Sequence, residues 1–305
     1  MKKLVTAFAL AVFAIGAMAA PADGAPAAEC EGVKVATGPK GKGYSTLFAD
    51  MQKLIKVPMC ELNTAGGLDN LNALSTKDAD IGFVQLDTWN DMKSGDDNIA
   101  SLQMVMPLNS NYLHVVTNVN GVQGEKKFGL IKGDTKIINR FSDLRGQRVA
   151  VVGSAQLLGR KLEKSVGYGM QFIDVKTDQE AFAMVKSGQV AAAFTVSGWP
   201  SGTVKQLSQA DGLTLVPFDA PIGEPYKVKA LNYKNIAVYN NNSLSIQNVL
   251  VSRSFSGQRA ANVTAIQAGI KRNLTELKEG NYQPGWKDVV NPNAAVQGMT
   301  PFKAK

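Results

Sequence analysis

The sequence predicts an α/β protein of two similar lobes around a shared cleft, because one local pattern occurs twice. An apolar strand ends in a glycine-containing turn that opens a helix, first at 33–44 and again at 148–156. A helix end, a short turn and a buried strand follow each copy, at 71–85 and 183–194. Helices that follow parallel strands direct their N-termini to one edge of the sheet, where unpaired N–H groups favour an anion.

The first half of the chain alternates between strands and helices, which implies a parallel sheet. The apolar spacing of Leu47, Phe48 and Met51 is helical. The polar, glycine-containing segment 121–133 reads as a crossover. We expect strands at 33–38, 61–64, 81–86, 101–108 and 112–118, and helices at 44–55, at 68–74 and from residue 87 onward.

The second half repeats the alternation and then returns to the first lobe. We expect strands at 148–152, 170–175, 190–195, 213–217 and 246–252, helices at 155–166, 178–187, 200–210 and 257–278, and a loop at 217–225. The last strand would carry the chain back, and the last helix would pack on lobe I. Two connections make a hinge. The predicted division is 30–119 with 248–305 for lobe I and 120–247 for lobe II.

The N-terminus has the features of a secretory signal peptide. Two lysines precede an apolar, alanine-rich run and a small-residue cleavage signal at 17–19. A membrane anchor is the alternative, but the apolar run is short and passes into a leader with proline and glycine. We expect a signal peptide at 1–20, a flexible leader at 21–29, and export to the periplasm.

The two cysteines predict one disulfide, Cys30–Cys60, because an exported protein meets an oxidising compartment. Cys30 precedes the first strand and Cys60 begins the second, and adjacent parallel strands would bring these starts together. Two free thiols are the alternative. A lipid anchor on Cys30 is disfavoured because Glu29 stands beside it.

The composition favours binding of anions over catalysis. The formal net charge is +8, but the lysines are scattered, which argues against nucleic acid and fits a mild attraction for anions. One histidine and two paired cysteines leave little for a transition metal. A nucleophile elbow is absent, since Pro200 takes its central position. We therefore expect no cofactor, no metal and no catalytic residue.

Three aromatic or imidazole side chains have two interpretations each. His114, the single histidine, lies in an apolar strand and is expected to be a packed core residue and not a base. Tyr226 and Tyr233 flank the segment before the return strand. Either could close over a ligand, but packing is the commoner role for such residues.

The glycine-rich turn at 38–43 is the strongest local signal for a ligand. Gly43 lets a ligand approach the backbone at the start of a helix, Lys42 adds charge, and Tyr44 adds a ring edge and a hydroxyl. The pattern matches neither a P-loop nor a dinucleotide fingerprint. A tight turn without a ligand is the alternative.

The same lobe repeats this device at its next two strand ends. Gly67 opens a helix, with Asn70 as a donor near its mouth and Asp69 read as an ordinary acid of the first turn. Gln85 and Asp87 follow the third strand, at the edge where open parallel sheets bind ligands. Asp87 could equally be the N-cap of a helix.

The corresponding strand ends of lobe II complete the predicted site. Ser154 and Gln156 follow one strand, and Gly198 and Trp199 follow another. Pro200 suits the first helical position and would leave Trp199 free to reach the cleft. A tryptophan of the core is the alternative.

The chain resembles the TAXI-type extracytoplasmic solute-binding proteins of TRAP transporters over most of its length beyond the leader. The matching phrases are TGPKGKGY at 37–44, GGLDNL at 66–71, ADIGFVQLD at 79–87, DLRGQRVAV at 143–151, GQVAAAF at 188–194 and GWP at 198–200. The family's glycine–tyrosine turn maps onto Gly43 and Tyr44, and its second helix mouth onto Gly67 and Asn70. The chain departs from the family at Ser45, at Gly67 and at 154–156.

The resemblance implies a two-lobed periplasmic binding protein of type II-like fold, each lobe a parallel-rich sheet flanked by helices. It implies a monomer that captures a small organic anion, a dicarboxylate or an acidic amino acid, by lobe closure and delivers it to a TRAP-type membrane permease. A ligand sensor or the binding protein of an ABC importer is the alternative. A periplasmic enzyme on the same scaffold, such as a dehydratase, is a third.

Overall fold

The computed structural model describes residues 30–124, 133–236 and 242–305, so the predicted signal peptide and leader lie outside the described residues. The strands are β1 (Val33–Ala36), β2 (Met59–Leu62), β3 (Ile81–Gln85), β4 (Gln103–Asn118), β5 (Val122–Gln123), β6 (Thr135–Lys136), β7 (Arg148–Val152), β8 (Gln171–Val175), β9 (Ala192–Ser197), β10 (Leu213–Leu215), β11 (Tyr226–Ala230), β12 (Asn242–Ser252) and β13 (Thr300–Pro301). The helices are α1 (Gly43–Leu54), α2 (Gly67–Ser75), α3 (Leu86–Met92), α4 (Asp97–Ala100), α5 (Ala155–Val166), α6 (Asp178–Lys186), α7 (Gly202–Lys205), α8 (Gly257–Arg272) and α9 (Leu274–Glu279), with 3-10 turns η1 (Phe141–Leu144), η2 (Gln209–Asp211) and η3 (Pro284–Asp288).

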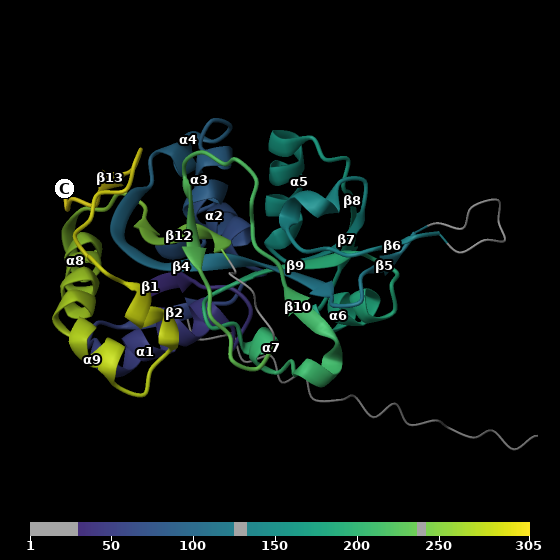
Figure 1. Ribbon diagram of the computed structural model, residues 1–305. Helices are drawn as coiled ribbons and strands as arrows, with labels where there is room; N and C mark the ends of the chain where they lie inside the picture. Colours follow the sequence, from purple (N-terminus) through teal and green to yellow (C-terminus); the bar gives the residue numbers. More distant parts are fainter. Residues whose placement is uncertain (1–29, 125–132, 237–241) are drawn as a thin grey trace, which may run out of the picture.

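One continuous sheet runs through both lobes, in the order β2-β1-β3-β12-β4-β9-β7-β8 (Figure 1). Its two ends are parallel, as predicted: β1 pairs with β2 and β3 at one end, and β7 pairs with β8 and β9 at the other. Between them, β12 and β4 are antiparallel to each other and to their outer neighbours. The predicted parallel sheets are therefore joined through two central strands.

These two central strands, β4 and β12, connect the lobes, and we propose that they form the hinge. β4 is a single strand of 16 residues, so the prediction of separate strands at 101–108 and 112–118 was wrong. Ser110 and Asn111 stay in the strand because Gln247 and Ile246 of β12 pair with them, and the register shifts just beyond, between Gln247 and Val249. β4 pairs with β9 from Tyr112 onward. We therefore propose that the chain crosses between lobes at Tyr112 and not at residue 119, and we use lobe I for 30–111 with 248–305 and lobe II for 112–247.

Lobe I packs helices on both faces of its part of the sheet. On one face, a cluster of buried residues joins α1, α8 and α9 to the strands; on the other, a second cluster joins α2, α3 and α4 (Figure 1). The expected packing of the last long helix on lobe I is confirmed. That helix is interrupted at Asn273, whose side chain donates to the Gly269 carbonyl at 2.9 Å, and it continues as α9.

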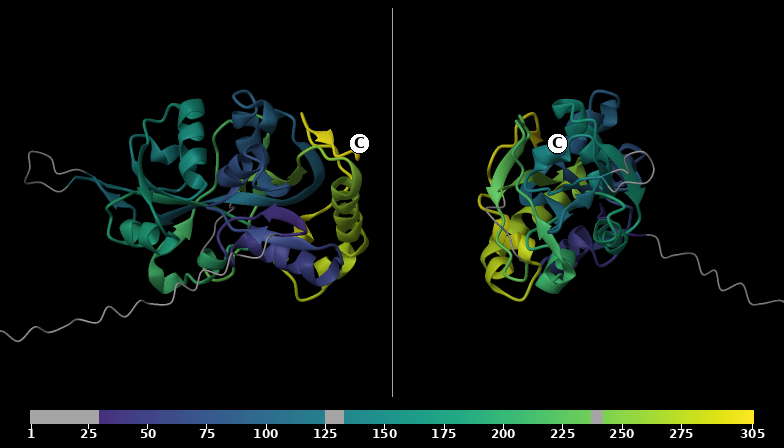
Figure 2. Two further views of the ribbon diagram at one scale, coloured as in Figure 1. Left: turned by 180° about the vertical axis from the view of Figure 1, so that it is seen from behind. Right: turned by 45° about the vertical axis from the view of Figure 1, so that its right-hand side comes forward.

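Lobe II is built in the same way, with α5 on one face and α6 and α7 on the other, as the two views of Figure 2 show. Strand β7 and helix α5 have the predicted bounds. The predicted helix at 200–210 is shorter, because the Asn235 amide donates to the Val204 and Leu207 carbonyls, both at 2.7 Å, and ends α7. Strand β11 lies after the predicted loop and was not predicted.

The predicted disulfide is confirmed. Cys30 and Cys60 are bonded, with 6.1 Å between their Cα atoms. The reason is the expected one: β1 and β2 are parallel neighbours, and Lys34 lies opposite Cys60. In the residues that the structure describes, we find no helix with the length and apolar character needed to cross a membrane.

Candidate functional site

Two glycine turns of lobe I lie against each other at the ends of β1 and β2. Gly38 and Gly66 have φ values of 134° and 139°, which side chains rarely adopt. A Cβ atom on Gly38 would lie 3.7 Å from the Gly66 Cα atom and 3.8 Å from a ring carbon of Tyr44. The Tyr44 ring also stacks on Phe83, with 5.3 Å between centroids. Tyr44 is therefore held at the meeting point of both turns.

A short polar chain leads from Tyr44 across the hinge to lobe II. The Tyr44 hydroxyl donates to Asn248 Oδ1 on β12 at 2.8 Å, and Asn248 Nδ2 donates to Asn109 Oδ1 on β4 at 3.3 Å. Asn109 Nδ2 then lies 3.8 Å from where a Cβ atom on Gly198 would stand. Burial, together with the charge of Asp87, raises the pKa of Tyr44, so its hydroxyl remains a donor.

The helices α1 and α5 begin without side-chain caps. Lys42 and Ser154 occupy their N-cap positions and make no capping bond, and neither helix has an acid in its first turn. By contrast, Thr177 caps α6, and acids stand in its first turn. Helix α8 also lacks a side-chain cap, so this feature alone does not define a site. It leaves free N–H groups at one strand end of each lobe.

The side-chain amide of Asn70 is already hydrogen-bonded to other groups of the protein. Its amide donates to the carbonyls of Thr37 and Phe83 at 3.0 and 2.7 Å, and it accepts from the Thr64 hydroxyl at 2.6 Å. Asn70 is fully buried, so these contacts tie β1, β2 and β3 together. Its role as a ligand donor stays a prediction, and it would require these bonds to exchange. Asp69 accepts from Ala65 N at 3.2 Å, as expected of an acid at a helix start.

Gly67 and Gln85 are brought together at the end of β3. A Cβ atom on Gly67 would lie 3.7 Å from the backbone nitrogen of Gln85. Gln85 is buried and is the N-cap residue of α3. The alternative role of Asp87, as the N-cap of this helix, is therefore excluded. Asp87 lies inside the first turn of that helix and is not its N-cap.

Asp87 joins the lobes. Its carboxylate accepts from Thr88 N at 2.8 Å and from the hydroxyl of Tyr226, on lobe II, at 3.1 Å. Asp87 is 3% exposed, and burial raises the pKa of its carboxyl although Lys161 opposes the shift. Of the two tyrosines with open roles, Tyr226 is thus the one that reaches across the cleft.

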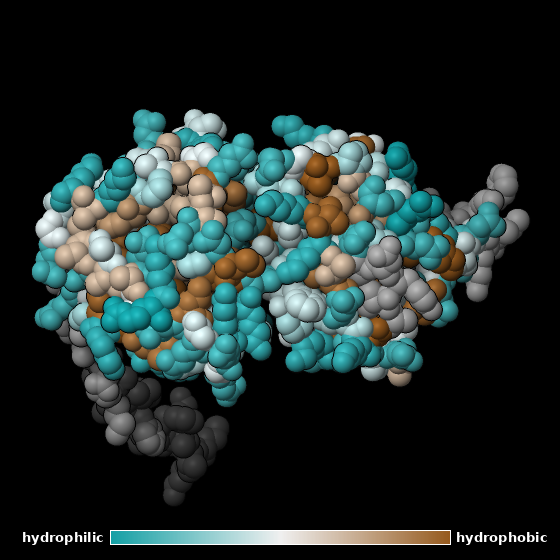
Figure 3. All heavy atoms as spheres, turned by 60° about the vertical axis from the view of Figure 1, so that its left-hand side comes forward, coloured by the Kyte–Doolittle hydropathy of each residue, from teal (hydrophilic) through white to brown (hydrophobic). Residues whose placement is uncertain are grey.

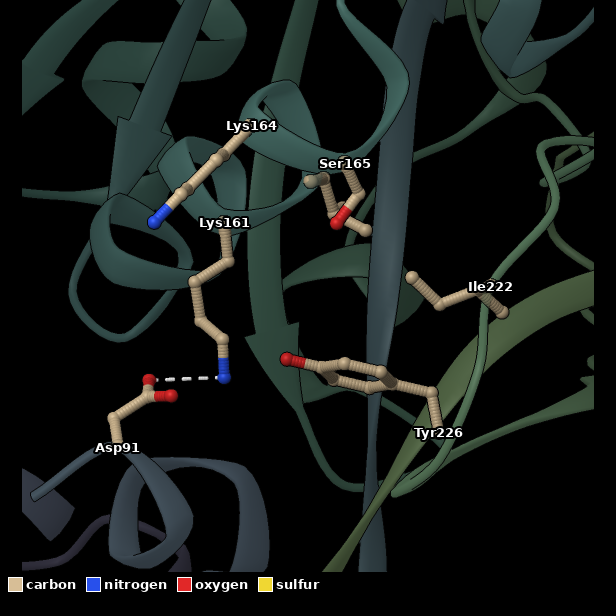
Figure 4. A pocket seen from close by; sticks show the side chains of 7 residues that line it. Asp91, Lys161, Lys164, Ser165, Ile222 and Tyr226 are labelled. Atoms are coloured by element: carbon tan, nitrogen blue, oxygen red, sulfur yellow. Dashed lines mark ion pairs between the residues drawn. The ribbon is translucent and has the colours of Figure 1, made fainter. Parts of the chain in front are cut away.

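Next to Asp87, a cavity of about 310 Å³ lies between α3, α5 and the segment that enters β11 (Figure 4). Lys161 on α5 forms an ion pair with Asp91 on α3 at 2.9 Å, across the two lobes. Lys164, Ser165, Ile222 and Tyr226 also line the cavity. A second cavity, of about 260 Å³, lies between α3 and 224–225. Neither of these two cavities is lined by a predicted site residue.

Lys229 makes a second connection between the lobes. Its ammonium group lies 2.7 Å from Asp288 and 3.0 Å from the Tyr112 hydroxyl, which also donates to Asp288. It stands 5.9 Å from the ring centroid of Trp199. Burial lowers the pKa of Lys229, but Asp288 and Tyr112 outweigh it and raise the pKa overall.

Three of the other predicted residues, Lys42, Ser154 and Gln156, are not members of this polar chain. Lys42 and Ser154 are exposed and Gln156 is half-buried, and within the described residues no side-chain hydrogen bond or ion pair joins them to another predicted site residue. Gly198 and Trp199 are half-buried beside the hinge. The structure therefore links Tyr44 to Gly198 through Asn248 and Asn109, and it places Gly67 beside Gln85.

The hinge asparagines were missed by sequence reasoning. Asn109 and Asn248 are 4% and 0% exposed and lie inside long, mostly buried strands. The available signal is the polar group at 109–111, which by sequence pattern alone predicts a break between two strands. A polar insertion within a long apolar strand also fits a strand that crosses a cleft.

His114 and Tyr233 are packed in the core, which is the role expected of His114 and the commoner role for a residue such as Tyr233. His114 is fully buried, with Nε2 at 2.7 Å from the Tyr233 hydroxyl, which accepts from Ser201 N at 2.8 Å. Burial lowers the pKa of His114 to about 4. In the part of the chain that the structure describes, no group of histidine, cysteine and acidic residues could hold a metal ion.

A groove separates the two lobes, with hydrophilic side chains on both rims (Figure 3). The fold matches two structures in which the ligand is arginine. Tv2483 bound to L-arginine is 11% identical with a TM-score of 0.52, over 87% of this chain and 94% of that one. An ancestral arginine-binding protein is 16% identical with a TM-score of 0.50, over 82% and 98%.

A third structure, the amino acid ABC transporter substrate-binding protein AbpA from Streptococcus pneumoniae bound to L-arginine, is 11% identical with a TM-score of 0.49, over 85% and 96%. The fold is thus that of the two-lobed periplasmic binding proteins. The chain itself belongs to the NMT1-like family, whose model matches residues 35–236.

Proposed function

We propose that the protein is an extracytoplasmic solute-binding protein that captures a small organic anion between its lobes and delivers it to a membrane permease. The observation that carries this proposal is the polar chain through the hinge. Tyr44 of lobe I, Asn248 and Asn109 of the hinge, and Gly198 of lobe II meet within hydrogen-bond or van der Waals distance. A ligand held there contacts both lobes and favours their closure.

The chemistry of these groups suits a carboxylate. The uncapped N-termini of α1 and α5 offer backbone N–H groups and the positive ends of two helices. Hinge amides add donors without charge, and the Tyr44 hydroxyl remains protonated. The ligand exchanges its water for these fixed donors, and no covalent step is involved.

Asp87 favours an amino acid over a dicarboxylate among the anions we consider. Its buried carboxylate lies beside the cleft, with Tyr226 as its partner from lobe II. A ligand ammonium group would lower the cost of keeping this carboxylate charged. An acidic amino acid supplies that ammonium group together with two carboxylates, whereas a dicarboxylate supplies none.

The test is a thermal-shift screen of the purified exported protein. The panel holds succinate, L-glutamate and L-arginine, with succinamide as a matched neutral control. A ligand at a hundred times its Kd should stabilise by about 2.7 kcal/mol, which raises the melting temperature by a few degrees. A dose-dependent rise for L-glutamate that succinamide does not produce supports the proposal. A flat response to all carboxylates would contradict it.

The variant Tyr44→Phe checks the location. Loss of the hydroxyl, which bonds Asn248, should raise the Kd for the ligand identified by the screen by about fivefold to tenfold. Tyr282→Phe is the matched control, because that hydroxyl bonds only Glu276 on the outside of lobe I. An equal effect of both variants would place the site elsewhere.

The permease is proposed to be of TRAP type, on the strength of the matching phrases in both lobes. The alternative is an ABC importer. The neighbouring genes distinguish the two: a permease of many helices supports the first, and an adjacent ATPase supports the second. The predicted signal peptide would place the protein in the periplasm.

A further inference from the structure

Two buried donors at the end of β9 have no partner. In the residues that the structure describes, Ser197 Oγ and Trp199 Nε1 are both shielded from solvent and make no hydrogen bond. Most buried polar atoms in folded proteins are paired, because an unpaired one carries the full cost of its desolvation. Two such atoms within three residues therefore call for an explanation.

Both residues lie where lobe II meets the hinge. Ser197 is the last residue of β9 and lies opposite Tyr112 of β4, the point at which that strand crosses between the lobes. Gly198, between the two donors, faces the amide nitrogen of Asn109. The Trp199 ring stands beside the Lys229 ammonium group. The unpaired donors thus lie next to the polar chain that begins at Tyr44.

The chemistry of these groups narrows what could satisfy them. An indole nitrogen only donates, and a serine hydroxyl donates or accepts. A partner that satisfies both must therefore be an acceptor, and the nearby Lys229 cation favours an acceptor that is charged. A carboxylate has two oxygens with enough lone pairs to accept from both donors at once.

We propose that Ser197 and Trp199 form the lobe II half of a carboxylate clamp, in which ligand oxygens accept from Ser197 Oγ–H and Trp199 Nε1–H. Lys229, fixed by Asp288 at 2.7 Å, acts as a positioning residue that orients the indole. This inference rests on the proposed function and names the side chains that close on the anion from the second lobe.

The chain contains its own internal controls, because it has three tryptophans. Trp89 Nε1 donates to the Ile99 carbonyl at 3.0 Å, and Trp286 Nε1 donates to Asp50 at 3.1 Å, so both are already paired. Among the three, Trp199 alone has an indole N–H without a partner in the described part of the chain. Nitrogen-15 indole spectra of the exported protein should therefore resolve one responsive signal and two insensitive ones.

The probe is acetate, which carries a carboxylate without the rest of any ligand. Titration should move the Trp199 indole N–H signal downfield and saturate, while the Trp89 and Trp286 signals stay in place. Sodium chloride at the same ionic strength, and neutral acetamide, should leave all three unmoved. Trp199→Phe assigns the signal and should not lower the melting temperature of the ligand-free protein, since an unpaired donor is removed.

Ser197→Ala tests whether the second donor belongs to the same clamp. It should weaken the apparent affinity for acetate by about fivefold to tenfold. Thr117→Val is the matched control, because Thr117 Oγ1 is also buried and unpaired but lies on β4 opposite Ala192, toward the far end of β9. It should leave the acetate response unchanged.

The failure of this clamp and of the proposed function can be told apart. If the screen finds an anion but the Trp199 signal does not move with it or with acetate, the clamp is wrong and the function stands. If acetate moves Trp199 and Ser197→Ala weakens that response, the clamp stands even where no panel ligand stabilises the protein. If acetate moves all three tryptophan signals equally, the clamp is wrong.

Discussion

Lobe I and lobe II differ in whether their buried polar side chains have hydrogen-bond or ion-pair partners. In lobe I, buried Asp50 accepts from Gln283 N and from Trp286, and Asp80 pairs with Arg253 and Arg259. The buried side-chain atoms that lack a partner in the described residues all belong to lobe II; they are on His114, Thr117, Ser197 and Trp199. Each such atom costs about 1–3 kcal/mol.

This difference assigns the lobes different parts in binding. Lobe I also carries the disulfide and the interlocked turns around Asn70, so it serves as a rigid platform. In the described residues, lobe II contains buried polar atoms without hydrogen-bond partners, and two of them, on Ser197 and Trp199, lie at the hinge. Strand β11 joins the lobes on both sides of the sheet, since Tyr226 reaches Asp87 and Lys229 reaches Asp288. The lobes are therefore held near each other by polar contacts that water can replace.

The largest expected effect comes from removing the disulfide of lobe I. The double variant Cys30→Ser, Cys60→Ser should lose about 3–4 kcal/mol of unfolding free energy, because the bond closes a loop between residues 30 apart. Urea denaturation of the oxidised protein measures this loss. Reduction of the parent protein should reproduce it. A loss below about 1 kcal/mol would mean that lobe I does not depend on the disulfide for its rigidity.

In lobe II, His114 should make stability depend on pH. Its pKa falls to about 4 by burial, from an ordinary value near 6.5, so the unfolded chain takes up the proton first on acidification. The contribution of the neutral imidazole is complete above pH 6.5 and is lost between pH 6.5 and 4, by about 3 kcal/mol in all. His114→Gln should abolish this part of the slope. An unchanged slope would mean that His114 is not desolvated as the structure places it.

At the junction of the lobes, Asp87→Asn should stabilise the protein at neutral pH. Burial raises the pKa of Asp87 in the folded state, so its stabilising protonated form is lost as the pH rises above the unfolded value near 3.9. The gain from the variant should therefore be present at pH 7 and absent below about pH 4. Urea denaturation at both pH values measures it.

Asp91→Asn is the control for this prediction. Its carboxylate pairs with Lys161 at the surface of the same junction and is 40% exposed, so its loss should cost at most about 1 kcal/mol at pH 7. A destabilising effect of Asp87→Asn at pH 7 would show that its contact with Tyr226 outweighs the cost of burial.

Elements were predictable where short-range chemistry decides them. Strand β7 and helix α5 have their predicted bounds because β-branched residues, Gly153 and the left-handed Gly167 mark the ends locally. The helix at 200–210 was predicted too long because Asn235, far along the chain, bonds its carbonyls. The strand at 103–118 was predicted as two strands because its partner β12 lies far along the chain: Ser110, near the centre of β4, pairs with Gln247, 137 residues later.

The residues of the candidate site also divide into those that local sequence predicts and those that depend on distant contacts. Tyr44 and Trp199 were predicted as site residues because each follows a strand and a glycine, which is a local pattern. Asn109 and Asn248 were missed because their role depends on two strands crossing between lobes, and the Lys161–Asp91 contact depends on how the lobes face each other.

The sequence by itself determined the repeated strand–turn–helix units, the disulfide and the fold class, since these follow from spacing and from the small choice of backbone conformations. Only the tertiary structure decided that β4 and β12 are continuous through both lobes and that Asn70 bonds to groups within lobe I. It also decided that Ser197 Oγ and Trp199 Nε1 have no partner among the described residues. Those outcomes depend on which groups from distant parts of the chain come together. Whether a buried polar group finds a hydrogen-bond partner is decided only when the complete sheet and its helices have packed.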